Sequence, residues 1–82
     1  MHISEVRQHL ETTPFVPFRI RMSSGETYDV PHPEFVLLTR WAIHLGLEVG
    51  DDNIPDRLVR LAISHVTEIE DIEPNVEAES SS

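Results

Sequence analysis

The amino-acid sequence predicts a mainly β fold in which an N-terminal helix precedes a bent, five-stranded small barrel. Three observations lead to this prediction. Apolar residues near the N-terminus recur at helical spacing, whereas from Phe18 onward they mostly alternate with polar residues, as they do in strands. Short clusters of glycine, serine, aspartate and asparagine separate the alternating runs. With 82 residues, the chain allows a single domain with a modest core.

The helix is expected over residues 3–12. Ile3, Val6 and Leu10 form one apolar stripe, and Ser4 is the predicted N-cap. Pro14 ends the helix, because the residue before a proline is driven out of the helical region. A helix this short is marginal in water, so we expect it to pack on the rest of the domain.

Residues 18–30 predict a β-hairpin. Apolar residues alternate with two arginines in "FRIRM", and a second alternating run, "TYDV", follows the turn "SSGE". Gly25 is expected at positive φ in that turn, since glycine takes this conformation at little steric cost. Pro14 and Pro17 place the start of the first strand near Phe18, because proline cannot donate to a strand ladder.

Two interpretations compete for residues 34–48. Apolar residues mostly occupy the odd positions after Glu34, which favours strands with a break near residues 39–40. Alternatively, Pro33 begins a second helix over about residues 34–48, which makes the protein α+β. The strand interpretation is preferred, and the helix is kept as the alternative.

The last strands are expected in "RLVRLAISHVTEIEDI". The parity of the apolar residues shifts at Ser64-His65, which predicts a bulge or a tight turn between two strand pieces. Residues 73–82 are acidic and serine-rich and have little apolar area, so we expect them to form a disordered tail. The folded domain is therefore expected to span residues 1–72.

The composition limits the classes of function. The absence of cysteine excludes a disulfide framework and a thiolate metal site, and it makes oligomerisation the expected source of extra stability. Six arginines and no lysine face fifteen carboxylates, which gives a formal net charge of −9. An acidic protein repels phosphate backbones, so nucleic-acid binding is not expected.

The sequence also indicates a cellular compartment. The first residues, "MHISEVRQHLETT", lack the basic and apolar regions of a signal peptide. No apolar run approaches the length needed to cross a bilayer. A cytoplasmic protein without a membrane partner is therefore expected.

The stretch "TPFVPFRIRMSSGETYDVPHPEFVLL" resembles a group of small uncharacterised bacterial proteins. Their pattern is P-F-x-P-F-x-I, then a glycine turn, then V-P-H-P-E-F, and it corresponds to Pro14–Leu38 of this chain. The segment "LAISHVTEIE" also resembles the end of those proteins. The resemblance implies a bacterial protein, but that group has no established activity to carry over.

The order of elements also resembles the Sm-like fold, including the Hfq branch, and more broadly SH3-like barrels. An N-terminal helix leads to a strand that ends at Ser24-Gly25, a strand with "FVLL" follows, and an "AIS" segment joins the last two strands. This resemblance implies a bent five-stranded sheet and a tendency to form rings. In Hfq, tyrosine, lysine and histidine precede "AIS". Val59, Arg60 and Leu61 stand there in this chain, so only a basic residue of the RNA pocket is kept.

The stretch "VPHPE" is the candidate for a chemical site. His32 and Glu34 are two residues apart, so in an extended chain they project to one face, as a general base with its partner or as two metal ligands. Pro31 and Pro33 instead indicate a bend at a strand end, because both lack the amide donor that a ladder needs. The bend is the preferred interpretation. No catalytic residue, resident metal or cofactor is assigned, since the sequence holds no phosphate loop or nucleophile elbow.

Arginines are the candidate nucleic-acid contacts if the Sm-like alternative holds. The four candidates are Arg19, Arg21, Arg40 and Arg60. Otherwise Arg19 and Arg21 are expected to form a solvated strand face that pairs with Glu26 or Asp29 across the hairpin.

These observations together predict a non-enzymatic interaction or assembly module, with a second copy of the chain or another protein as its partner. The strands near Leu58–Ile63 and Val66–Ile69 contain no proline, glycine or lysine that blocks edge pairing, so a homo-oligomer is expected. Trp41 is expected either in the core or at a subunit interface. The alternatives are an Sm-like RNA-binding ring and a small metal- or ligand-binding protein that uses His32 and Glu34.

Overall fold

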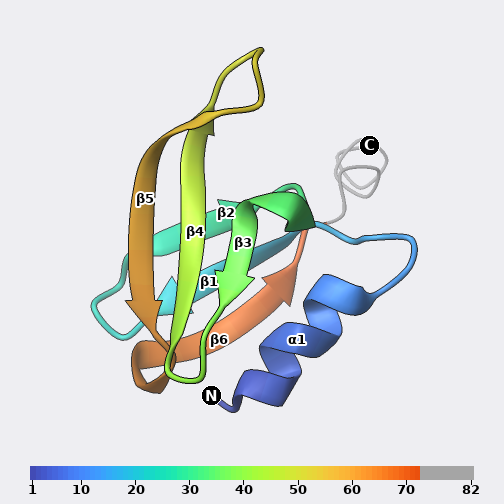
Figure 1. The fold of residues 1–82 in the computed structure, drawn as a ribbon. Helices are drawn as coiled ribbons and strands as arrows, with labels where there is room; N and C mark the ends of the chain where they lie inside the picture. Colours follow the sequence, from blue (N-terminus) through green and yellow to red (C-terminus); the bar gives the residue numbers. More distant parts are fainter. Residues whose placement is uncertain (73–82) are drawn as a thin grey trace, which may run out of the picture.

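The computed structural model describes residues 1–72, which fold into one α-helix and six strands (Figure 1). The strands form two three-stranded antiparallel sheets that share one core. The prediction of a mainly β fold with an N-terminal helix is confirmed. The two sheets are separate, however, and within residues 1–72 their six strands do not close into a barrel. The tail expected at residues 73–82 lies outside the described residues.

Helix α1 spans Ile3–Glu11, one residue less than expected. Its N-cap is His2, whose Nδ1 atom accepts a hydrogen bond from the Ser4 N–H at 3.2 Å. The prediction of Ser4 as the cap was wrong, because the preceding histidine supplies the acceptor and the helix begins earlier. Val6 is fully buried, so α1 is held by packing on the core as expected.

The first sheet has the strand order β2-β1-β6. Its strands are β1 (Phe18–Met22), β2 (Thr27–Val30) and β6 (Val66–Asp71). Phe18 and Ile20 are fully buried, whereas the two arginines of β1 lie on the opposite face. Gly25 has a φ of 96° in the β1–β2 turn, and the two strands pair in antiparallel register, which confirms the predicted hairpin.

The second sheet has the strand order β3-β4-β5. Its strands are β3 (Val36–Leu38), β4 (Ala42–Val49) and β5 (Pro55–Ala62). The break expected near residues 39–40 is the β3–β4 turn, in which the Thr39 N–H donates to the Ala42 carbonyl at 3.0 Å. The strand interpretation of this region is therefore confirmed.

The alternative of a second helix over residues 34–48 is wrong. Only a single 3₁₀ turn, η1 (Pro33–Phe35), uses the proline as a helix start. Ile43 and Leu45 are two residues apart and both reach the core, as the period of a strand requires. β4 also pairs with a neighbour on each side, which stabilises the extended chain.

Two 3₁₀ turns carry the chain between the sheets. η1 joins β2 to β3, and η2 (Ile63–His65) joins β5 to β6. η2 is the tight turn that the parity shift predicted. Figure 1 shows α1 beside β6, with the first residues of the chain near the end of β5. In agreement with the position of α1 beside β6, the His9 Nδ1 atom lies 3.6 Å from the Asp71 Oδ1 atom at the end of β6.

The core lies between the sheets, and one hairpin extends beyond it. The largest fully buried side chains are Phe18, Ile20, Ile43, Leu45, Val6 and Val30. The β4–β5 hairpin projects past the rest of the molecule (Figure 1). We call residues 48–55 of this hairpin the arm. The chain turns there with positive φ at Glu48 (57°) and Asn53 (63°).

Candidate functional site

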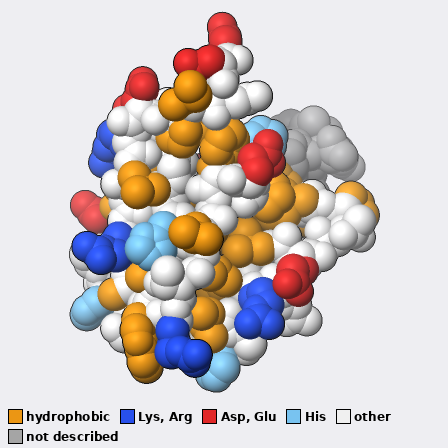
Figure 2. All heavy atoms as spheres, viewed as in Figure 1, with side chains coloured by type: hydrophobic (Ala, Val, Ile, Leu, Met, Phe, Trp, Pro, Cys, Tyr) orange, Lys and Arg blue, Asp and Glu red, His pale blue; other side chains and the backbone are white. Residues whose placement is uncertain are grey.

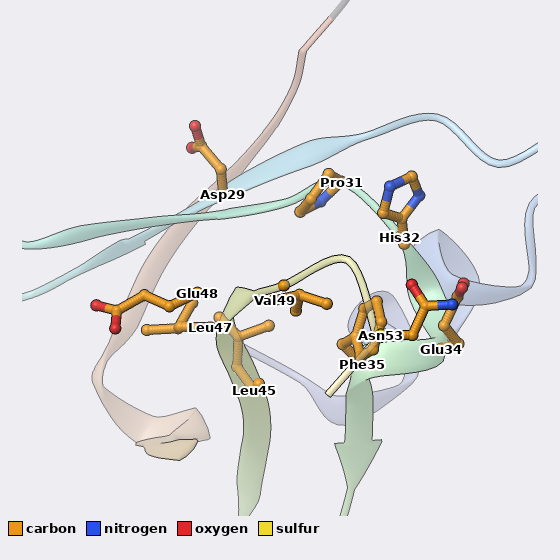
Figure 3. Close-up of a pocket in the computed structure, with 12 residues that line it drawn as sticks. Asp29, Pro31, His32, Glu34, Phe35, Leu45, Leu47, Glu48, Val49 and Asn53 are labelled. Carbon is orange, nitrogen blue, oxygen red and sulfur yellow. The ribbon is translucent and has the colours of Figure 1, made fainter. Parts of the chain in front are cut away.

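A groove lies between the end of β2, η1 and the arm, and it includes both residues of the predicted chemical site (Figure 3). Its volume is about 650 Å³. The apolar lining comes from Pro31, Phe35, Leu45, Leu47 and Val49, and the polar lining from Asp29, His32, Glu34, Glu48 and Asn53. The groove therefore combines apolar contact area with several hydrogen-bonding side chains.

His32 and Glu34 do not form the pair that their spacing suggested. His32 is extended, with φ −141° and ψ 134°, and it immediately precedes η1. A 3₁₀ turn rotates the chain by about 120° per residue, so the same-face rule for an extended chain does not hold at Glu34. The His32 ring lies edge-on to the ring of Phe35, with centroids 6.4 Å apart. The stretch forms a bend at the end of β2.

The carboxylates around the groove do not assemble a metal site. Figure 3 shows Glu48 and Glu34 at opposite ends of the groove. Over residues 1–72, no group of three or more histidine, aspartate or glutamate side chains lies close enough to hold a metal ion. The polar side chains of the groove offer hydrogen bonds to a bound molecule.

Arg19 and Arg21 are engaged by carboxylates on the outer face of the first sheet. Arg19 Nε donates to Asp29 Oδ1 at 2.7 Å, across the hairpin as predicted, and this hydrogen bond raises the pKa of Arg19. Arg21 donates to Glu68 at 3.1 Å and to Glu70 at 2.9 Å, both on β6 and not on the hairpin. Because three carboxylates surround two guanidinium groups, this face does not present free positive charge to a phosphate.

Arg40 and Arg60 lie on a different part of the surface. Arg40 is in the β3–β4 turn, and Arg60 lies on β5 opposite His44 of β4. Both are exposed, and neither forms an ion pair with another residue in the described part of the chain. The four arginines of the RNA-binding alternative are therefore divided between two surfaces.

The outer face of the second sheet carries large exposed apolar side chains. Leu37 on β3 is 65% exposed and Leu58 on β5 is 72% exposed. Between them β4 contributes Gly46, which pairs with Leu58. A groove of about 510 Å³ crosses this surface, and Figure 2 shows hydrophobic side chains gathered over the same sheet. We call the surface formed by Phe35, Leu37, Gly46, Pro55 and Leu58 the apolar sheet face.

Gly46 is required by the close approach of the arm. A Cβ atom at this position would lie 2.7 Å from Pro55 Cγ and 3.0 Å from Pro55 Cβ. Carbon atoms in contact are about 3.5–4.0 Å apart. The missing side chain therefore makes room for the ring of Pro55, which packs against the β4 backbone at Gly46.

Trp41 is not a core residue. It is 78% exposed at the end of the β3–β4 turn, although its carbonyl accepts a hydrogen bond from the Ile63 N–H at 2.9 Å. Trp41 lines a groove of about 490 Å³ with the first residues of the chain and the end of β5. An exposed tryptophan on a fixed backbone is suited to a subunit interface, which stays a prediction.

Comparisons with known proteins do not assign this chain to a family. No protein-family model, curated protein or solved structure matches it. The resemblances drawn from the sequence motifs therefore stay predictions. None of the helical segments within residues 1–72 combines the length and the apolar character needed to span a membrane.

Sequence reasoning missed the apolar sheet face, although a signal was present. Leu37 and Leu38 are adjacent, so in a strand one of them must point away from the core. Leu58 likewise stands on the opposite parity from Leu61 and Ile63, which the structure buries. These breaks in alternation mark the two most exposed leucines in the described part of the chain.

Proposed function

We propose that this chain is a non-enzymatic assembly module that associates with a second copy through the β3-β4-β5 sheet. The observation that carries the proposal is the apolar sheet face, on which Leu37 and Leu58 are 65% and 72% exposed. Fully covering one leucine side chain is worth about 1.5–3 kcal/mol. Contiguous exposed apolar area on a small domain marks a surface that another molecule covers.

The small-barrel resemblance supports the same proposal. β2 and β3 lie in different sheets and flank the single turn η1. Counting them as one bent strand gives five strands, the number that the Sm-like resemblance implies. The "AIS" segment lies where β5 passes through η2 into β6, as that resemblance implies. Assembly of subunits through strand edges is the tendency that the Sm-like resemblance adds.

The RNA-binding alternative has weaker support. Arg19 and Arg21 are bonded to Asp29 and to carboxylates of β6, and the net charge is −9. We expect only weak binding of RNA at physiological salt. Retention of RNA through purification in moderate salt would favour this alternative over simple assembly.

A small-ligand site is the second candidate, and the groove beside His32 favours it. Its volume of about 650 Å³ falls within the range of about 300–1,000 Å³ that is usual for ligand pockets. Chemical-shift changes confined to His32 and Asn53 on addition of a small polar molecule would support this use. Such binding is compatible with assembly, because Leu58 is not among the residues that line this groove.

Sedimentation velocity across the micromolar range tests the assembly proposal. We expect the sedimentation coefficient to rise from the monomer value to that of a larger species as concentration increases. Leu58→Ser should move this transition to higher concentration, because it removes an exposed apolar side chain from the sheet. Ile54→Ser is the matched control, since Ile54 is 60% exposed but lies in the loop of the arm. A monomer at every concentration would contradict the proposal.

A further inference from the structure

Strand β5 is an open edge of the second sheet. The order β3-β4-β5 leaves one side of β5 without a strand partner within residues 1–72. The first residues of the chain and the β1–β2 turn share grooves with β5 only at Arg60, Leu61 and Ala62, and Figure 1 shows no element of the described chain beside the first part of this edge. With eight residues, β5 is also longer than the other edge strands, β2, β3 and β6, which have four, three and six. A long uncovered edge is the place where a further strand can add.

The direction of the β5 backbone groups follows from two hydrogen bonds at the start of β4. The Ala42 carbonyl accepts from Thr39 on the β3 side, and the Trp41 carbonyl accepts from Ile63 on the β5 side. Backbone groups alternate in direction along an antiparallel strand. In the observed β4–β5 register, the odd-numbered residues of β5 therefore bond to β4. The N–H and C=O groups of the even-numbered residues from 56 to 60 point outward.

The side chains of these three edge residues have a self-complementary order. Asp56, Leu58 and Arg60 are two residues apart and share the outer face of the sheet. The shared face follows from strand alternation, and the Pro55 ring beside Asp56 reaches Gly46 from the start of the strand. All three residues are exposed, and neither charged residue has an ion-pair partner within the described chain. Asp56 and Arg60 are about 13 Å apart along the strand, so they cannot pair within one chain. A reversed copy of the strand presents each of them with its opposite charge.

We propose that β5 pairs in antiparallel register with β5 of a second copy, around a two-fold axis at Leu58. Leu58 then lies opposite the partner's Leu58, and Asp56 lies opposite the partner's Arg60 on both sides of the axis. The outward N–H and C=O groups of the two strands bond to each other, and the two three-stranded sheets become one. This inference rests on the proposed self-association and names the contact that produces it.

Charge and apolar matching select this register over its neighbours. Sliding the second strand by two residues in either direction sets Leu58 opposite a charged residue and leaves both charges without an oppositely charged partner. Sliding it by four residues sets Arg60 opposite itself or Asp56 opposite itself, and like charges directly opposite are destabilising. Only Pro55, at the first position of β5, lacks an amide donor, and it lies outside the central pairs.

Exchanging the two charges tests the inference. Asp56→Arg and Arg60→Asp each place like charges opposite one another twice, so each should raise the dimer dissociation constant at least about tenfold. The double variant Asp56→Arg/Arg60→Asp restores opposite charges and should recover the affinity of the natural chain. An equimolar mixture of the two single variants should form a heterodimer, because residue 56 of one then meets residue 60 of the other with opposite charge. Sedimentation velocity measures these affinities, and far-UV circular dichroism checks that each variant is folded.

A matched control separates edge pairing from packing between faces. Leu37 lies on the same outer face but on β3, two strands away from the proposed axis, and it is nearly as exposed as Leu58. Leu37→Ser should weaken the dimer much less than Leu58→Ser, because only Leu58 lies at the axis. Equal dissociation by Leu37→Ser and Leu58→Ser would overturn the inference in favour of face-to-face packing. A dimer insensitive to both single charge variants would also overturn the edge contact but leave self-association standing. A natural chain that is monomeric throughout would remove the proposed function itself.

Discussion

Replacing Gly46 by alanine is expected to destabilise the protein. The added Cβ would lie 2.7 Å from Pro55 Cγ and 3.0 Å from Pro55 Cβ, where carbon atoms normally pack at about 3.5–4.0 Å. The proline ring cannot rotate away, so β5 and the arm must shift to admit the methyl group. Overpacking of this kind costs about 1–3 kcal/mol. Phe35 Cβ, at 3.6 Å, is an ordinary contact and adds no strain.

Urea unfolding followed by far-UV circular dichroism measures this cost. Trp41 fluorescence is a poor probe, since its side chain is 78% exposed in the folded chain. Protein concentration is held fixed, because self-association makes stability depend on it. Pro55→Ala removes the nearest atom, so the double variant should recover part of the loss, with a coupling energy of about 0.5–3 kcal/mol. An unchanged midpoint for Gly46→Ala, or no recovery in the double variant, would refute the argument that the arm rests on Gly46.

Gly25→Val should lower the free energy of unfolding by about 1 kcal/mol or more, because a φ of 96° strains a β-branched residue. The strain is expected although no atom lies within 4 Å of the added Cβ. Equal urea midpoints for Gly25→Val and the natural chain would contradict this prediction. Tyr28, the one tyrosine of the sequence, should ionise above its ordinary pKa of 10.0, since its hydroxyl donates to Glu26. The hydrogen bond from Tyr28 to Glu26 stabilises the folded state fully below the pKa of Tyr28 in the unfolded chain, and this contribution is lost as pH rises through the pKa of Tyr28 in the folded chain. In an alkaline absorbance titration Glu26→Gln should lower the midpoint, and an unmoved midpoint counts against the hydrogen bond. Ile43→Ala should lower the free energy of unfolding by about 2–5 kcal/mol, because Ile43 is fully buried. Ile54→Ala, at an exposed site, should lower it by less than about 0.5 kcal/mol, and thermal unfolding of the two variants measures the difference.

Local chemistry was sufficient to predict the hairpin and the turns. Gly25 gave the turn between β1 and β2, and the parity shift at Ser64-His65 gave η2, because both features depend on residues that are neighbours in the sequence. The choice between strand and helix over residues 34–48 stayed open, since β4 is stabilised by pairing with strands on both sides. The division into two sheets likewise depends on the bend at η1 and on how the halves pack.

The candidate site was less accessible from the sequence. The bend at His32 was predicted, but the groove beside it is completed by residues of β4 and the arm, which the sequence pattern does not place beside the end of β2. Arg21 was expected to pair within the hairpin, yet its partners, Glu68 and Glu70, lie on β6 at the end of the domain. Such long-range contacts follow from the strand order, which an alternating pattern does not encode.

Cross-linking at Leu58 tests the proposed two-fold contact most directly. The natural chain has no cysteine, so Leu58→Cys adds a single thiol. In the proposed register residue 58 forms a hydrogen-bonded pair with its copy, with Cα atoms about 5.5 Å apart. The Cβ atoms of such a pair are about 5.5 Å apart, wider than the range of about 3.5–4.5 Å in a disulfide, so a short bismaleimide linker is used in place of oxidation. We expect the linker to convert Leu58→Cys rapidly into a covalent dimer, while Leu37→Cys, of similar exposure, stays a single chain. Equal cross-linking of the two variants, or none in either, would contradict pairing of β5 with itself.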